Sequence, residues 1–263
     1  MLKQRFITAV IALVVLGVVL FVVPPVVARG FIVLLVAAGA WEWGGFLFRD
    51  NNAGRAAYVV FILVLIGTLF LNLASPGLPD NIFRIALVWW VVALVWILFY
   101  PTPIPPVLSW VCGALVLVPA WAALDQLYRQ MPNLLLFALL IVWVADIGAY
   151  FVGRGFGRVK LAPEVSPGKT WEGVLGGLAA VTLLAALGSR LLDIEIAVLV
   201  PLALAMAMLS IVGDLTVSMF KRAAGVKDSG TLFPGHGGVL DRIDSVTAAA
   251  PLFALALAWI GLA

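Results

Sequence analysis

The segment with the most chemical potential is residues 218–244, SMFKRAAGVKDSGTLFPGHGGVLDRID, which is dense in charge within a mostly apolar chain. Charged groups near lipid are costly and usually mark a functional site. Carboxylates beside lysines and arginines suit a hard cation such as Mg²⁺, which takes one or two protein carboxylates and completes its shell with phosphate oxygens and waters. The residues that support this interpretation are Lys221, Arg222, Lys227, Asp228, Asp241, Arg242, Asp244 and the only histidine, His236.

Further acids are expected to approach this segment from inside apolar helices. Asp146 precedes Gly153, where a loop is expected to begin, by seven residues, and Asp214 precedes Lys221 by the same interval. At 1.5 Å per residue, each carboxylate would lie roughly 10 Å below its helix end. Glu172 would open the next helix from the same side, and Asp241 would lie just before the last helix. The alternative is that each acid is isolated and simply paired with a lysine or arginine.

Glycines and the histidine suggest a place for an anion. Gly235, Gly237 and Gly238 would let backbone N–H groups approach a phosphate closely. His236, which lies among them, either donates a hydrogen bond to phosphate or is a turn residue. Zinc is not expected, because the only histidine and the only cysteine, Cys112, lie in different segments. Cys112 is expected to pack in the core.

A second candidate anion site lies at Ser166–Thr170. Ser166 is predicted to cap a helix that Pro167 starts, so that the helix N-terminus with Lys169 and Thr170 faces an anion. A plain helix start with a lysine reaching toward water is the competing interpretation. Glu42, between Trp41 and Trp43, is predicted to be an interfacial anchor, with a place in the site as the alternative.

The elements that must position these residues are membrane helices. The chain has 263 residues, 64% of them hydrophobic and 11% charged, well outside the usual range of soluble domains. We therefore predict an all-α, polytopic transmembrane protein with a single membrane domain, in which residues 1–130 supply helices one to five and residues 131–263 supply four catalytic helices with their loops. Apolar runs long enough to span a bilayer occur at nine places: 6–23, 30–48, 56–73, 82–100, 107–124, 133–152, 172–192, 196–220 and 245–262.

The basic residues predict an orientation. Lysine and arginine favour the cytoplasmic side of a membrane. With nine spans, twelve of the sixteen fall on the side of the N-terminus and of the charged segment, and four fall on the other. The N-terminus and the charged segment are therefore predicted to be cytoplasmic. The first apolar run, 18 residues long, exceeds a usual cleaved signal core and is expected to stay as a helix.

The charged segment also resembles a known family. Its pattern is similar to the diagnostic motif of CDP-diacylglycerol synthases (phosphatidate cytidylyltransferases): Ser218-x-x-Lys221-Arg222-x4-Lys227-Asp228-x-Gly230-x2-Phe233-Pro234-Gly235-His236-Gly237-Gly238-x2-Asp241-Arg242-x-Asp244. The blocks Asp146-x-Gly148-Ala149-Tyr150-x2-Gly153 and Ser166-Pro167-x-Lys169-Thr170-x-Glu172-Gly173 are similar too. The resemblance covers about 140–250, whereas the first five helices match only in hydrophobicity.

The resemblance implies that phosphatidic acid and CTP give CDP-diacylglycerol and pyrophosphate, with Mg²⁺ required and held by Asp214 and Asp241. It also implies a monovalent ion such as K⁺, a homodimer, and a place in the cell (inner) membrane. The chemistry agrees, because an ionised phosphate monoester needs positioning and charge neutralisation rather than a strong base.

The expected roles fall into three sets. The catalytic set is Asp214, Asp241, Lys221, Arg222, Lys227 and Arg242, in which the basic residues neutralise phosphates. The substrate-binding set is Lys169, Ser166, Thr170, His236, Gly235, Gly237, Gly238 and Asp228. The metal set is Asp214, Asp241, Asp146, Asp244 and Glu172.

Three alternatives remain at this level. A transporter or flippase would place charges along a path at mid-membrane, whereas here they gather near one face and no inverted repeat is evident. A CTP-dependent polyprenol kinase would also consume CTP but would release CDP. A non-catalytic scaffold would tolerate loss of Asp214 and Asp241.

Overall fold

The computed structural model describes residues 2–72, 77–232 and 237–261, with side chains from residue 10 onward. Within these residues the chain forms helices and one small antiparallel sheet: α1 (Leu2–Phe21), α2 (Pro25–Leu47), α3 (Asn52–Asn72), α4 (Leu78–Leu98), α5 (Pro106–Gln130), α6 (Pro132–Phe156), β1 (Lys160–Ala162), β2 (Ser166–Thr170), α7 (Trp171–Leu192), α8 (Ile196–Ala223) and α9 (Leu240–Trp259). Helices α2 to α9 are each long and apolar enough to cross a membrane, and the part of α1 from Val10 to Phe21 is apolar as well. The predicted all-α, polytopic fold is confirmed.

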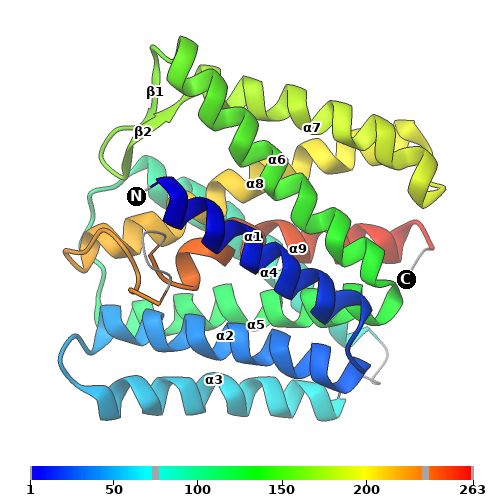
Figure 1. Ribbon diagram of the computed structural model, residues 1–263. Coiled ribbons are helices and arrows are strands. Elements are labelled where there is room, and N and C mark those ends of the chain that lie inside the picture. The colour runs from blue at the N-terminus through cyan, green and yellow to red at the C-terminus, as the bar shows by residue number, and fades with distance from the viewer. Residues whose placement is uncertain (1, 73–76, 233–236, 262–263) are drawn as a thin grey trace.

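Successive helices run in opposite directions through the bundle (Figure 1). The hairpin β1–β2 lies at one end, which we call the hairpin end. The start of α1, the α2–α3 turn, the α4–α5 connection and the α8–α9 loop also lie at this end. The predicted grouping of the charged segment with these connections is therefore confirmed, while its assignment to the cytoplasm stays a prediction.

Helix α9 joins the two predicted parts of the chain into one core. It packs against α8 and also against α4 and α5. Cys112 is fully buried in this core, as expected. Within lipid, burial of apolar side chains does not drive helices together, because the lipid tails are equally apolar. Close packing between the helices therefore has to stabilise the bundle. At Gly213 an added Cβ would lie 2.6 Å from the carbonyl oxygen of Asp244, so α8 and α9 touch backbone to backbone beside the acids.

Glycines also bring α6 and α7 together, along the upper edge of the bundle in Figure 1. A Cβ at Gly177 would lie 2.6 Å from the carbonyl oxygen of Ala145, and one at Gly148 would lie 2.9 Å from that of Gly176. Because Gly148 and Gly177 have no side chains, the backbones of α6 and α7 can approach each other this closely. The α6 residue Asp146 is thereby fixed relative to α7 and to the hairpin that precedes it.

The predicted helix start at Ser166 is wrong. Residues 166–170 form β2, which pairs with β1 across a turn in which the Val165 N–H donates to the Ala162 carbonyl (3.2 Å). A residue before proline is extended whether it caps a helix or lies in a strand, so the pairing with β1 makes Ser166 part of a strand. Helix α7 starts at Trp171, four residues after the predicted start at Pro167, and the Thr170 hydroxyl accepts a hydrogen bond from the Gly173 N–H there (3.2 Å).

Three predicted helices were too short. Helix α9 begins at Leu240, so Asp241 lies in its first turn rather than before it. Helices α6 and α8 continue to Phe156 and Ala223. Asp146 and Asp214 therefore lie roughly 15 and 14 Å from their helix ends, still at similar depths but deeper than predicted.

An acid at the opposite end provides a contrast. Asp125 in α5 is 2% exposed and accepts hydrogen bonds from Arg29 Nε (2.6 Å), Arg29 Nη2 (3.1 Å) and Arg129 Nε (3.0 Å). Its charge is matched by two arginines, and the helix predicted over 107–124 continues through Asp125 to Gln130.

Candidate active site

One face of α8 organises the charged groups at the hairpin end. Asp214, Ser218 and Lys221 are separated by four and three residues, which places them on a single face of a helix. The Ser218 hydroxyl donates to Asp214 Oδ1 (3.1 Å). The polar face runs along the last two and a half turns of α8 and points toward α9 and the hairpin.

The hairpin supplies the first acid–lysine pair. Lys169 Nζ lies 2.6 Å from Asp214 Oδ2, and the two side chains are 25% and 26% exposed. Lys169 is on β2, next to the residue that caps α7, so the hairpin, not a helix N-terminus, carries this lysine to α8. The pair remains open to solvent and therefore to a charged ligand.

The second pair is almost fully buried. Lys221 Nζ lies 2.7 Å from Asp241 Oδ1, with side chains that are 9% and 6% exposed. Asp241 Oδ2 accepts hydrogen bonds from the backbone N–H groups of Ser229 and Gly238, each at 2.9 Å. Asp241 therefore joins the start of α9, the end of α8 and both sides of the loop between them.

Two more acids complete the cluster. Asp244, 7% exposed, lies within electrostatic range of Asp214 and Lys221. Asp146 lies within range of Asp214, Lys169 and Arg242. Of the four acids predicted to converge, Asp146, Asp214 and Asp241 thus lie at the hairpin end on α6, α8 and α9, with Asp244 beside them. The fourth, Glu172, binds a backbone N–H group instead.

The donor set suits an ion that needs few protein ligands. Among the described residues, no three acidic, histidine or cysteine side chains are grouped closely enough to hold a metal by themselves. Mg²⁺ commonly takes one or two carboxylates and fills its octahedron with phosphate oxygens and water. A carboxylate offers about four acceptor positions; Asp214 uses two and Asp241 three. Both acids keep acceptor capacity, so these residues fit Mg²⁺ that is bound together with a phosphate ligand.

Two predicted site residues are engaged with the backbone. Both carboxylate oxygens of Glu172 accept from the Val159 N–H at 3.2 Å. The Arg222 guanidinium donates to the carbonyls of Val165 and Val226, both at 3.3 Å. Both side chains therefore hold the loops at the hairpin end, and their roles as metal ligand and phosphate binder stay predictions.

The remaining predicted residues lie around the cluster. Lys227, Asp228 and Arg242 are exposed, and Ser166 is half-buried. Gly237 has φ of 79°, in the left-handed region where glycine is favoured. Gly235 and His236 lie outside the described residues. The proposed contacts of all these residues with substrate stay predictions.

Glu42 was misjudged from the sequence. It is not an interfacial anchor: only 7% of it is exposed. Its carboxylate accepts from the Ser229 hydroxyl (2.7 Å) and from the N–H groups of Val239 (2.9 Å) and Leu240 (2.8 Å). The flanking tryptophans suggested the wrong environment. The useful signal was an acid inside an apolar helix near the same bundle end as Asp214.

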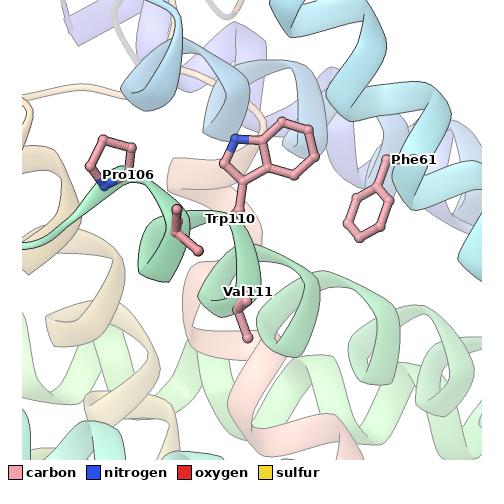
Figure 2. A pocket seen from close by; sticks show the side chains of 5 residues that line it. Phe61, Pro106, Trp110 and Val111 are labelled. Atoms are coloured by element: carbon pink, nitrogen blue, oxygen red, sulfur yellow. The ribbon is translucent and has the colours of Figure 1, made fainter.

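An apolar pocket of about 320 Å³ lies elsewhere, between α3 and α5 (Figure 2). None of its lining residues is ionisable, and none belongs to the predicted site; they are Phe61, Pro106, Val107, Trp110 and Val111. Chemistry on phosphates needs charge, so this pocket is not the reaction centre.

A family model and two known proteins match the chain along nearly its whole length. A model of the cytidylyltransferase family matches residues 3–260. The chain is 45% identical to a phosphatidate cytidylyltransferase of Pseudomonas aeruginosa, over 98% of the chain and 97% of that protein. It is 39% identical to the phosphatidate cytidylyltransferase of Haemophilus influenzae, over 96% and 97%. A Brucella suis protein with the same name is 49% identical over 46% of the chain and 45% of its own length.

Proposed function

Because the chain belongs to the cytidylyltransferase family, we propose that it transfers the cytidylyl group of CTP to phosphatidate, forming CDP-diacylglycerol and pyrophosphate. The observation that carries this proposal is the pair of acid–lysine contacts, Lys169–Asp214 and Lys221–Asp241, at one end of a membrane bundle. The lysines suit phosphate groups, and the acids suit the cation that accompanies them. A lipid headgroup and a water-soluble nucleotide can both reach such a place.

The reaction needs one displacement. A phosphate oxygen of phosphatidate attacks the α-phosphorus of CTP and forms a new P–O bond. The bond from that phosphorus to the oxygen shared with the β-phosphate breaks, and pyrophosphate leaves with the electron pair. A phosphate monoester is largely ionised at neutral pH because its second pKa is about 6. The protein therefore has to position the two substrates and neutralise their phosphate charges, and it does not have to abstract a proton.

The charged residues divide this work between them. Lys169, with a quarter of its side chain exposed, is placed to meet phosphate oxygens directly. Lys221 is buried, so it does not meet substrate directly. It holds Asp241 in place through their ion pair and contributes positive electrostatic potential to the site. The exposed Lys227 and Arg242 can reach phosphates that approach from the hairpin end, and an arginine can bind phosphate with two hydrogen bonds.

Asp214 and Asp241, assisted by Asp146 or Asp244, would hold Mg²⁺ in this proposal. When bound, Mg²⁺ neutralises charge on the triphosphate and orients it. The acceptor positions left on Asp214 and Asp241 support this assignment. A monovalent ion such as K⁺ beside Mg²⁺ rests on the family resemblance.

The proposal also includes a location. The excess of lysine and arginine at the hairpin end supports a cytoplasmic site in the cell (inner) membrane. CTP is a cytosolic nucleotide, and phosphatidate would present its headgroup at the same interface while its tails stay in lipid. A homodimer is proposed from the resemblance.

The direct test is to incubate the purified protein with cytidine-labelled CTP, phosphatidate vesicles and Mg²⁺. We expect a cytidine-bearing lipid and an equal amount of pyrophosphate, and no product with diacylglycerol in place of phosphatidate. Release of CDP with phosphorylation of a polyprenol would instead identify a lipid kinase. Movement of lipid or ions with CTP left intact would identify a transporter. Chelation of divalent ions should stop the reaction, and added Mg²⁺ should restore it.

A further inference from the structure

Glu42 reaches the site from a part of the chain that the motifs do not include. It lies on α2, 199 positions before Asp241, and five residues before the end of its helix. Its three hydrogen bonds all go to the segment that leads into Asp241: to Ser229, Val239 and Leu240. This carboxylate thus joins the α8–α9 loop at Ser229 to the start of α9.

These bonds act as a helix cap supplied from another helix. The first N–H groups of a helix lack partners within it, and the helix dipole favours a negative charge there. Val239, at the N-cap position of α9, offers no side-chain cap. Glu42 takes that place, with Oε1 on the Val239 N–H and Oε2 on the Leu240 N–H.

Glycines make room for the carboxylate. A Cβ at Gly238 would lie 2.2 Å from Glu42 Oε2, and one at Gly230 would lie 2.5 Å from Oε1. Both distances are shorter than any real contact of this kind. Gly230 and Gly238 belong to the charged segment, and the structure gives this reason for glycine at both positions: Glu42 fills the space that side chains would occupy.

Glu42 and Asp241 share their supports. Ser229 donates its hydroxyl to Glu42 (2.7 Å) and its backbone N–H to Asp241 (2.9 Å). Gly238 donates its N–H to Asp241 (2.9 Å), and the Glu42 carboxylate occupies the place that a Cβ on Gly238 would take. A change at Glu42 would therefore move the backbone donors that orient Asp241.

We infer that Glu42 is a positioning residue for the reaction: it fixes the loop and the first turn of α9 so that Asp241 is held ready for Mg²⁺ and phosphate. This inference rests on the proposed function for its kinetic consequence, but its structural consequence can be measured without turnover. Glu42 has no assigned contact with substrate and acts through Asp241.

The test compares Glu42→Gln with Glu195→Gln, which neutralises an exposed glutamate at the opposite end of the bundle. A glutamine at position 42 has one acceptor oxygen and an NH₂ group, which would face an N–H or a hydroxyl donor instead of accepting from it. Hydrogen–deuterium exchange on the purified protein should show faster exchange at Val239 and Leu240 in Glu42→Gln, and unchanged exchange there in Glu195→Gln.

Kinetics separate positioning from folding. In Glu42→Gln we expect kcat to fall about tenfold or more, since at least one of the three hydrogen bonds is lost and the others lose the carboxylate's charge. We also expect the Mg²⁺ concentration for half-maximal rate to rise, with the KM for phosphatidate unchanged. A merely misfolded fraction would lower the maximal rate and leave the Mg²⁺ response as it is. If Glu42→Gln does not fold, Ser229→Ala, which removes one of the three bonds, should show smaller shifts in the same direction.

Each outcome decides the inference. Faster exchange at α9 together with the altered Mg²⁺ response supports it. Wild-type exchange, or faster exchange with wild-type kinetics, overturns it. A wild-type protein that makes no cytidine lipid overturns the proposed function instead, and the exchange result then still reports whether Glu42 caps α9.

Discussion

Replacing Lys221 with methionine tests whether the buried pair at the centre of the site has the energetic role that its geometry suggests. Lys221 and Asp241 are 2.7 Å apart, and their side chains are 9% and 6% exposed. Removing one partner of a buried ion pair costs about 3–5 kcal/mol, because the other charge is left without compensation. Asp241 would keep the N–H donors of Ser229 and Gly238, so we expect the lower end, about 3 kcal/mol.

The assay is unfolding of the purified protein in mixed micelles of increasing SDS content, read beside the rate of cytidylyl transfer. Lys221→Met should lower both stability and rate. The double variant Lys221→Met/Asp241→Asn should regain most of the stability, because no unpaired charge remains, but not the rate. Lys160→Met, at an exposed position on β1, is the matched control and should change stability by no more than about 0.5 kcal/mol.

Two results would refute this reasoning. A Lys221→Met protein with the stability and rate of the wild type would show that the pair has no energetic weight. A double variant as unstable as the single one would show that the loss comes from packing of the lysine stem and not from an unpaired carboxylate.

Three other predictions follow from the site. Asp214→Asn and Asp241→Asn should each lower turnover by about a hundredfold or more, because charge stabilisation is removed from the transition state. Both variants should still insert in membranes. Normal turnover in both would remove these two residues from the proposed metal site. Lys227→Ala should raise the KM for CTP with unchanged stability, because the side chain is exposed; a loss of protein yield alone would indicate a structural role. Thr170→Ala should destabilise the protein by about 1 kcal/mol through loss of the cap on Gly173, and Thr170→Ser should not; equal rate losses in both, without a stability change, would point to substrate contact instead.

Much of the fold could be predicted because lipid imposes simple rules on sequence. A helix must be long and apolar to cross a bilayer, and the apolar runs that met this rule became helices. The errors occurred where polar residues belong inside helices. Asp241 was expected just before the last helix, whereas it lies in the first turn of α9, where its carboxylate binds Lys221 and two backbone N–H groups.

The candidate site could be predicted only in part. Asp214 and Lys221 were identifiable because charge is rare in apolar helices, and their separation by seven residues places them on one face. Lys169 was assigned to a helix start, but it reaches Asp214 from a strand. Local propensity could not decide between these, since the choice depends on pairing with residues 160–162.

The sequence alone determined that this chain spans a membrane many times and gathers its acids and lysines near one face, because the cost of charge in hydrocarbon restricts where such residues can lie. Only the tertiary structure decided which charges meet. It pairs Lys169 with Asp214 and Lys221 with Asp241, and it brings Glu42 across the bundle to cap α9. Hydrogen bonds and ion pairs depend on distances of about 3 Å between atoms, and distances between helices far apart in the chain are set by packing, which no local pattern encodes.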